Sequence, residues 1–386
     1  KMHILEIDLT STALDLTTAY ANDIVPNPNG NKNSNDGFKI RETLSQLCER
    51  KRTEGEEVYA GINTGFFDSN DGFARGMHIE EGEPVYVNNQ GVRNSLVNHA
   101  WGFTLFTDGT ASCGKKEVSG KMEIAGKEYE YFSVNDTIVR LGHKTYYANL
   151  YTSRYKEVPH ADHPELVNPL SKTALYVVAK YNSGVMTVNN GYAEATVSAI
   201  HDGRTTTLDK APYLEAADEV AIQLTGDNAA EIAAALKVGD TIKLKADVAI
   251  DGVTKPIYTL NSTMFQFLKN GKDNTGSLAD NSSNNTKFDP ITFAAVDQAG
   301  TKVWFVVVDG RQINLTDGVW TSMGLKAYEM MQVAKRLGAY NMTRFDGGGS
   351  TAMWAYSDGT GALVNTPSDA KGERSCMNYI YIRARK

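Results

Sequence analysis

Apolar and polar residues alternate along many short stretches of this chain, a period of two that predicts strands. Residues 3–20 follow this pattern and predict an opening strand or hairpin. Residues 39–52 carry apolar side chains at helical spacing and predict a helix. Residues 58–62 predict a short strand that runs into Asn63. Strand-like segments with turn signals continue to about residue 150, with hairpin corners expected at residues 80–83 and 107–110.

The middle of the chain keeps the strand pattern. Residues 172–270 are expected to be mostly β, with one short helix at about 228–236. The clearest strands are predicted at residues 174–179, 219–224 and 241–250. The polar, asparagine-rich stretch 273–287 predicts a mobile surface loop.

The final hundred residues carry the most regular pattern. Strands are predicted at 291–296, 303–308 and 342–345, and an amphipathic helix at 322–337 separates the last two. The residues expected to cap this helix are Thr321 or Ser322 at its start and Gly338 at its end.

These elements predict one domain over residues 1–386 of class α+β. We expect a mixed β-sheet core with flanking helices, and a β-rich middle region at 172–270. Most candidate site residues fall in the segment 288–386. No internal repeat is apparent.

Composition excludes several classes of protein. The chain has 386 residues and a net charge of −7, which argues against a nucleic-acid-binding protein. It has no apolar run of 18 residues, so no membrane span is expected. Its three cysteines are far apart, which argues against a zinc site or a disulfide framework and favours buried, reduced thiols. No motif indicates a metal or another cofactor, and the oligomeric state stays open.

The stretch Asp346-Gly347-Gly348-Gly349-Ser350-Thr351 is the strongest candidate for a functional site. Glycine accepts positive φ and lets a ligand approach the backbone. Successive exposed N–H groups suit an anion, and the acid and two hydroxyls add hydrogen-bonding groups. A plain turn rarely needs three glycines, so we expect this one to be functional.

Polar residues also follow two other predicted strands. Asp309-Gly310-Arg311 follows the strand 303–308, and Asn63 follows the strand 58–62. If the strands 303–308 and 342–345 are parallel neighbours, Asp309 and Asp346 open at the same edge of the sheet, where α/β proteins bind ligands. Alternatively, Asp309 only forms a turn, since Asp-Gly is a common turn pair.

A second polar loop covers residues 367–374. Arg374 could bind a phosphate through two parallel hydrogen bonds. Asp369 or Glu373 could act as a general acid or base. Taken alone, this stretch is more typical of a solvated charged loop.

Together, these motifs resemble those of the phosphodiester glycosidases. This family includes N-acetylglucosamine-1-phosphodiester α-N-acetylglucosaminidase and many bacterial proteins. Each motif is weak alone, but all occur in the family's order along nearly the whole chain. The matching segments are Asn63–Phe67, Pro290–Thr292, Asp309–Arg311, Tyr328–Glu329, Asp346–Thr351, Asn365–Asp369 and Gly372–Arg374.

Two positions depart from the family pattern. Ile291 stands where the family usually has an arginine before the threonine, and Thr64 replaces a glycine of the first turn. In the family pattern, this arginine is expected to bind the phosphate. Arg311 and Arg374 are the candidate substitutes for it in this chain.

The resemblance implies hydrolysis of a sugar-1-phosphodiester at the anomeric C–O bond, in an extracytoplasmic location. Phosphate is a good leaving group, so the site must hold the departing anion and stabilise positive charge at C1. The expected catalytic residues are Asp346, Glu373, Asp309 and Asp369. The expected substrate-binding residues are Asn63, Thr292, Arg311, Gly347, Gly348, Gly349, Ser350, Thr351, Arg374 and Asn378. The expected partner is a small-molecule or glycan phosphodiester.

Two alternatives stay open. The first is a carbohydrate-binding or cell-envelope protein that keeps the fold without catalysis, which Ile291 favours. The second is a phosphodiesterase that cuts the P–O bond.

Overall fold

The computed structural model describes residues 1–26, 40–67, 74–88, 100–136, 146–158, 170–274, 276, 286–313 and 319–385. Strands dominate these residues. The α-helices among them are α1 (Leu44–Thr53), α2 (Asp227–Ala235) and α5 (Ala327–Leu337). The expected β-sheet core with flanking helices is found, but the class is mostly β and not a balanced α+β mix, with short helices beside large sheets. Alternation of apolar and polar residues runs through most of the chain, whereas helical spacing is confined to short segments.

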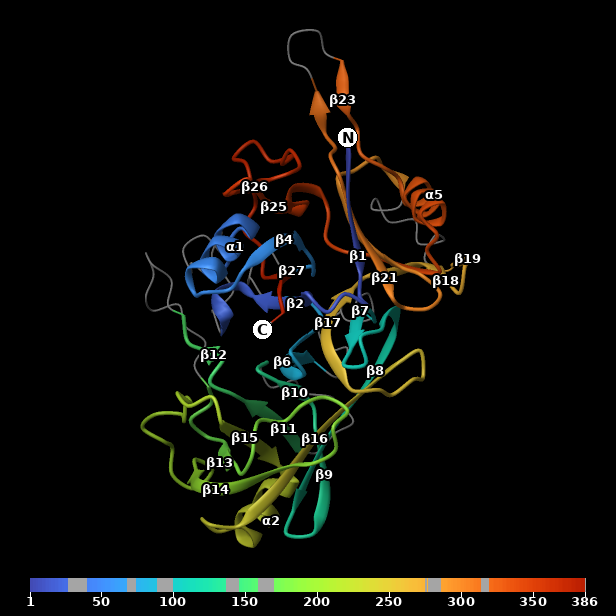
Figure 1. Cartoon of the computed structure of the whole chain (residues 1–386). Helices are drawn as coiled ribbons and strands as arrows, with labels where there is room; N and C mark the ends of the chain where they lie inside the picture. Colours follow the sequence, from blue (N-terminus) through green and yellow to red (C-terminus); the bar gives the residue numbers. More distant parts are fainter. Residues whose placement is uncertain are drawn as a thin grey trace.

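Two antiparallel sheets form the upper half of the molecule (Figure 1). The six-stranded sheet has the order β1 (Met2–Asp8), β21 (Lys302–Val308), β20 (Ile291–Val296), β24 (Asn341–Arg344), β18 (Phe265–Lys269) and β19 (Lys272–Asp273). The five-stranded sheet has the order β2 (Leu14–Tyr20), β27 (Asn378–Ala384), β4 (Val58–Asn63), β25 (Met353–Ser357) and β26 (Thr360–Leu363).

These two sheets pack face to face. Phe305 and Val307 of the six-stranded sheet share one apolar cluster with Ile62 and Ile380 of the five-stranded sheet. Helix α5 packs on the outer face of the first sheet, and α1 packs on the outer face of the second. Each sheet is therefore buried on both faces, and the polar ends of its strands lie at the edge of the sandwich.

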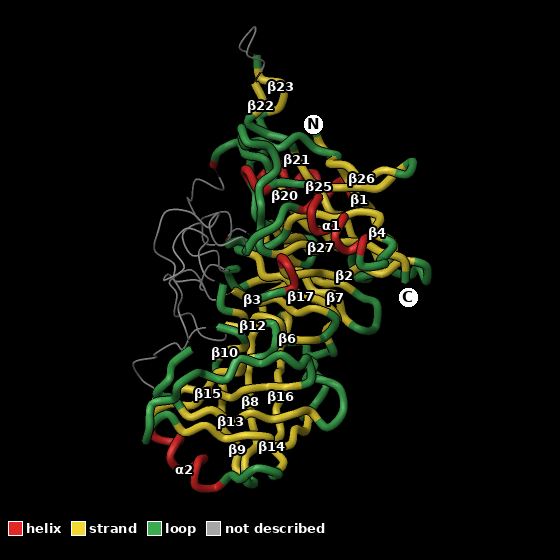
Figure 2. Tube along the Cα trace, turned by 90° about the vertical axis from the view of Figure 1, so that its left-hand side faces the viewer, coloured by secondary structure: helices red, strands yellow, loops and turns green. Residues whose placement is uncertain are grey.

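The lower half is a twelve-stranded sheet that closes on itself, since β16 pairs with both β14 and β8 (Figure 2). Its order is β16 (Thr241–Ile250), β14 (Ala193–Asp202), β13 (Leu175–Tyr181), β15 (Glu219–Gly226), β11 (Tyr146–Tyr151), β10 (Ser133–Val134), β6 (Glu83–Asn88), β5 (Met77–Glu80), β17 (Ile257–Thr263), β7 (Trp101–Phe106), β8 (Ala111–Ile124) and β9 (Lys127–Tyr131). Closure pairs the edges that an open sheet would expose.

Shorter elements complete the chain. Strand β3 (Val25–Pro26) pairs with β12 (Tyr155–Lys156), and β22 (Gln312–Ile313) pairs with β23 (Trp320–Ser322) in a hairpin that projects from the top of the molecule (Figures 1 and 2). Among the described residues, 3₁₀-helices occur at η1 (Ala21–Asp23) and η4 (Gly348–Ser350).

The N-terminal residues form two strands, but they do not form a hairpin. Strand β1 pairs with β21, whereas β2 pairs with β27, so the two strands belong to different sheets. Each strand adds an edge to a sheet whose other strands lie far along the chain. Alternation in sequence identifies such a strand but does not identify its partner.

Helix α5 begins later than expected. Residues 320–322 are taken by β23, so neither Thr321 nor Ser322 caps the helix. Lys326 occupies the N-cap position, and its backbone N–H donates to Glu329 at 2.9 Å. Gly338 ends the helix as predicted, with φ of +92°.

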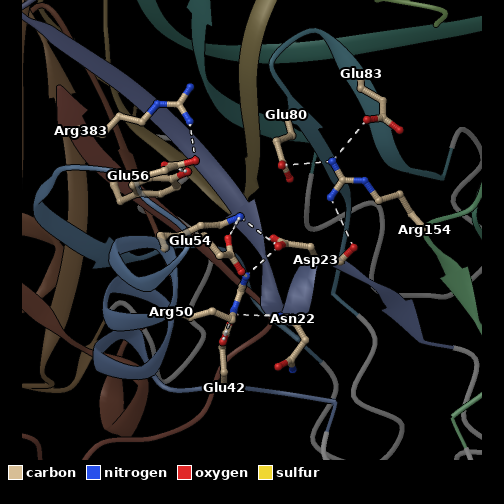
Figure 3. Close-up of polar contacts among 12 residues, drawn as sticks. Asn22, Asp23, Glu42, Arg50, Glu54, Glu56, Glu80, Glu83, Arg154 and Arg383 are labelled. Carbon is tan, nitrogen blue, oxygen red and sulfur yellow. Dashed lines mark hydrogen bonds and ion pairs between the residues drawn. The ribbon is translucent and has the colours of Figure 1, made fainter. Parts of the chain in front are cut away.

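A network of charged residues links α1, the 3₁₀-helix η1 and the β5–β6 hairpin (Figure 3). Arg50 of α1 donates to Glu42, Asp23 and Glu54. Arg154 bridges Glu80 and Glu83 of the β5–β6 hairpin. The His78 hydrogen bond and the positive charge of Arg154 outweigh burial and lower the pKa of Glu80 to about 2.

Cys48, Cys113 and Cys376 are buried and free, as predicted. Among the described helices, none is long and apolar enough to cross a membrane. Most of the predicted mobile loop at 273–287, namely residues 275 and 277–285, lies outside the described residues.

Candidate active site

Three strand ends meet at one edge of the sandwich. Strand β20 lies between β21 and β24 and is antiparallel to both, so these two strands run in the same direction without being neighbours. Asp309 and Asp346 therefore follow strands that end at the same edge, although the expected parallel pairing is wrong. Asn63, at the end of β4, joins them from the other sheet, because its Nδ2 donates to the Asp346 main-chain oxygen at 2.8 Å.

The glycine-rich turn, residues 346–351, carries the chain from β24 in one sheet to β25 in the other. The Asp346 N–H donates to Thr64 O at 2.8 Å, and the Gly348 N–H donates to Pro290 O at 2.9 Å. The N–H groups of Gly347, Ser350 and Thr351 also have protein acceptors. Most N–H groups of the turn therefore donate to protein acceptors and hold the turn in place. An anion bound at the turn would accept hydrogen bonds mainly from neighbouring side chains.

Each glycine of the turn faces an arginine. Gly348 has φ of +62°, and a Cβ there would lie 3.2 Å from the Arg311 Nη2. A Cβ at Gly347 would lie 2.7 Å from Pro290 O and 3.1 Å from the Arg344 Nη2. The missing side chains thus let two guanidinium groups approach the backbone.

The third glycine admits an ion pair. A Cβ at Gly349 would overlap both the Arg374 Nη2 and the Asp369 carboxylate. Arg374 donates to Asp369 through Nε at 2.8 Å and Nη2 at 3.0 Å, and its Nη1 lies 3.4 Å from the Ser350 Oγ. Asp369 therefore orients Arg374 across the turn.

Arg311 is oriented by a carboxylate in the same way. Its Nε donates to the Asp289 Oδ1 at 2.9 Å, and its Nη2 lies 2.7 Å from the same atom. Arg311 has φ of +57° and a side chain that is 48% exposed, so a ligand can reach it from solvent.

Arg344 is a site residue that the sequence analysis missed. It is the last residue of β24, opposite Phe293 of β20, and its side chain is buried. Burial lowers the pKa of Arg344, and the negative charges of Asp289 and Asp346 oppose that effect. The available signal was a charged residue in an otherwise buried strand, two positions before the acid of the turn.

Asp346 is half-buried at the centre of these groups. Its Oδ1 accepts from the Gly347 N–H at 2.9 Å. Burial raises the pKa of Asp346, while the Ser350 hydrogen bond and the charge of Arg374 act in the opposite direction. A carboxyl group whose pKa is raised by burial, with two arginines close by, is a candidate functional group.

Several predicted residues fix the backbone around the turn. The Asn63 Oδ1 accepts from the Thr292 Oγ1 at 2.7 Å and from the Ala352 N–H at 3.0 Å. The Asn378 Oδ1 accepts from the Gly65 N–H at 2.8 Å. Asn63, Thr292 and Asn378 are all buried, so their contacts with the protein position the turn and its neighbours.

The remaining predicted acids lie at the margin of this arrangement. Asp309 is buried, accepts from the Thr366 N–H at 3.0 Å, and has its other oxygen 3.6 Å from the His3 Nε2. Glu373 accepts from the Ser45 N–H in the first turn of α1, where a negative charge is favourable.

Two buried hydroxyl groups belong to residues adjacent in sequence to Ser350 and Asp369, which both contact Arg374. Within the described part of the chain, the Thr351 Oγ1 and the Ser368 Oγ are buried and have no hydrogen-bond partner. Buried polar atoms in native proteins are nearly always satisfied, so these two indicate a bound water or ligand group. No cluster of His, Cys, Asp or Glu that could hold a metal occurs among the described residues.

Comparisons with solved structures show the fold. A hypothetical protein from Synechocystis is 16% identical with a TM-score of 0.61, and the match covers 100% of this chain and 59% of that one. A candidate exported protein from Burkholderia pseudomallei K96243 is 20% identical with a TM-score of 0.62, and the match covers 99% of this chain and 73% of that one.

The zebrafish N-acetylglucosamine-1-phosphodiester α-N-acetylglucosaminidase catalytic domain, auto-inhibited by its pro-peptide, is also matched. It is 11% identical with a TM-score of 0.39, and the match covers 100% of this chain and 83% of that one. No curated protein matches the sequence. The profile of the phosphodiester glycosidases, however, matches residues 177–383, which is more than half of the chain. This chain therefore belongs to the phosphodiester glycosidase family.

Proposed function

We propose that this protein hydrolyses a sugar-1-phosphodiester at the bond between the anomeric carbon and the phosphate oxygen. The observation that carries the proposal is the glycine-rich turn, where a half-buried Asp346 interacts with Arg344 and Arg374, and Arg311 lies against Gly348. Family membership supports the same reaction class.

The arginines hold the phosphodiester and the phosphate that departs. Arg311 and Arg374 are each oriented by a carboxylate and remain partly exposed, so their outer N–H groups can donate to phosphate oxygens. The Thr351 and Ser368 hydroxyls have no hydrogen-bond partner in the described part of the protein, and we propose that they donate to the same anion. These groups stabilise the negative charge that develops as the C1–O bond breaks.

Asp346 acts at the sugar. As a carboxylate it stabilises positive charge at C1 or activates water, and as an acid it donates a proton to the leaving oxygen. Glu373, Asp309 and Asp369 support this chemistry by fixing α1, the Thr366 loop and Arg374, respectively. Asn63, Thr292 and Asn378 hold the backbone on which these groups stand.

Ile291 favours a second candidate function, a carbohydrate-binding protein without catalysis. Its side chain is fully buried in the apolar cluster under α5, so this position supplies no charge to the site. In that case the turn would bind a sugar phosphate without turnover.

The location that we propose is extracytoplasmic. The Burkholderia relative is named as a candidate exported protein, and none of the described helices spans a membrane.

The test is hydrolysis of the methyl phosphodiester of N-acetylglucosamine 1-phosphate. Phosphorus NMR should show methyl phosphate appearing with an equal amount of free reducing sugar. The Asp346→Asn variant is the matched control, and its rate should fall at least a hundredfold. Saturable binding of the diester to the wild-type protein without product would support the carbohydrate-binding function instead.

A further inference from the structure

The charged side chains around the glycine-rich turn alternate in sign. Arg311 pairs with Asp289, whose charge also acts on Arg344. Arg344 faces Asp346, and Asp346 interacts in turn with Arg374. Arg374 pairs with Asp369. The turn is therefore surrounded by three guanidinium groups and three carboxylates, and their formal charges cancel.

Four further ionisable groups lie near this set: Asp309, Glu373, Cys376 and Arg41. Asp309 faces His3, and Glu373 accepts from the first turn of α1. Behind Asp346 lies Cys376, whose pKa is raised to about 12 by burial, so its thiol is neutral at physiological pH. Arg41 is a further cation, which acts on Cys376.

A bound phosphodiester upsets this balance. It brings one negative charge into a partly buried region where charges are poorly solvated, and an uncompensated charge there is costly. Protonation of one carboxylate would restore neutrality.

Hydrogen bonding distinguishes the three acids. Asp289 and Asp369 each accept two charge-assisted bonds from one arginine, and a proton on either would weaken them. Asp346 instead accepts from neutral donors, the Gly347 N–H and the Ser350 hydroxyl. Protonation of Asp346 would therefore weaken fewer charge-assisted hydrogen bonds than protonation of Asp289 or Asp369. It would also give Asp346 an O–H that can donate to the bound anion.

We propose that a phosphodiester monoanion binds at the glycine-rich turn together with one proton, which Asp346 takes up from solvent. This inference deepens the proposed function and rests on its anion site. It assigns Asp346 the protonated state when the substrate is bound, so that the residue enters the reaction as an acid beside the leaving oxygen. Arg344 has a part in this balance, since it is the cation that faces both Asp289 and Asp346.

The raised pKa of free Asp346 agrees with this assignment, because burial already disfavours its charged form. Binding of an anion raises that pKa further. Between the free and the bound pKa, the affinity for the anion should fall about tenfold for each pH unit of increase, since one proton is taken up per anion.

The test uses dimethyl phosphate, which stays a monoanion across the accessible pH range and has no sugar bond to cleave. Calorimetric titration of the wild-type protein in two buffers of different ionisation enthalpy gives the number of protons taken up. We expect close to one proton per anion between the pKa of free Asp346 and its higher pKa in the complex, and close to none below the pKa of free Asp346. The Asp346→Asn variant should bind dimethyl phosphate with no proton uptake and no dependence of affinity on pH in this range.

Asp202→Asn is the matched control, because Asp202 ends β14 and pairs with Arg204. Strand β14 lies at the bottom of Figure 1, whereas β25, which follows the turn, lies in the upper half. It should behave as wild type. The inference is overturned if the wild-type protein binds the anion without taking up a proton, if Asp346→Asn keeps the uptake, or if dimethyl phosphate does not bind. Since no hydrolysis is involved, failure of the proposed reaction is a separate outcome, seen only with the sugar diester.

Discussion

The side-chain amide of Asn63 donates to the main-chain oxygen of Asp346 at 2.8 Å. These two residues stand at the ends of strands in different sheets, so this bond joins the two layers of the sandwich at the candidate site. The Asn63 Oδ1 accepts two further bonds, from Thr292 and from Ala352 at the far end of the turn. One buried amide therefore holds both ends of the glycine-rich turn.

Replacing Asn63 with alanine should lower both stability and activity. Three hydrogen bonds are lost and their partners stay buried, so we expect a loss of about 2–4 kcal/mol in the free energy of unfolding. The rate should fall at least tenfold, because the turn loosens. Asn189→Ala is the control, since Asn189 also makes three side-chain bonds, to Val248 and Lys255, in the closed lower sheet. It should lose stability but keep its rate per folded molecule; an equal loss of rate in both variants would contradict the role of Asn63.

Gly349→Ala should separate activity from stability. The new methyl group would overlap the ends of the Arg374 and Asp369 side chains, which are both partly exposed and can move away. We expect a melting temperature within a few degrees of wild type and a rate at least tenfold lower, because Arg374 is displaced. Thermal denaturation and the diester assay check the two parts, and an unchanged rate would remove the Arg374–Asp369 pair from the site.

Arg374→Ala should reduce hydrolysis by about two to three orders of magnitude, as for the loss of one donor to a developing anion. The folded state should be little affected, since the ion pair is partly exposed. Arg204→Ala is the matched control, because Arg204 makes the same two-bond pair with Asp202 away from the site. Steady-state kinetics of both variants is the measurement. Comparable rates for Arg374→Ala and Arg204→Ala would contradict the role of Arg374 in hydrolysis.

Asp346→Asn should stabilise the protein at neutral pH. Burial raises the pKa of Asp346 in the folded state, so folding favours the protonated carboxyl group. The stability that this group contributes is fully present below its unfolded-state pKa and is lost as pH rises through its folded-state pKa. The variant should therefore unfold at a higher temperature than wild type at pH 7, and the difference should vanish below about pH 4. A variant that is less stable than wild type at pH 7 would mean that the carboxylate holds the turn.

Glu80→Gln should show the opposite dependence on pH. The pKa of Glu80 is lowered to about 2, so its contribution is present above the unfolded value and is lost as pH falls. We expect the variant to be less stable than wild type by about 2 kcal/mol at pH 7, because Arg154 loses one of its two acids. Urea denaturation at several pH values should show this difference shrinking between pH 4 and pH 2; a constant difference would contradict the charge effect.

The sequence predicted individual strands well and their partners poorly. Residues 291–296 and 241–250 form strands with the predicted limits. These limits could be predicted because the order of apolar and polar residues within a strand depends on which of its faces are buried. The pairing of β1 with β21, and the closure of the lower sheet through β16 and β8, depend on residues far apart in the chain. No local pattern contains that information.

The same limit applies to the site. The glycines and the acid of the turn were visible as a motif, since their spacing is local. The role of Asn63 as a clamp, and the approach of Arg344 to Gly347, follow from how the two sheets meet. A polar residue that serves the backbone and one that serves a ligand look alike in sequence.

The most direct test of the central claim is hydrolysis of the methyl phosphodiester of N-acetylglucosamine 1-phosphate in water labelled with ¹⁸O, followed by mass spectrometry of both products. Cleavage at the anomeric carbon places the label in the sugar and leaves methyl phosphate unlabelled, and this is the expected result. The sugar should be isolated quickly, because its free anomeric oxygen exchanges with water. Label in methyl phosphate, or in the phosphate of a sugar phosphate product, would mean that the P–O bond is cut and would contradict the assignment as a glycosidase.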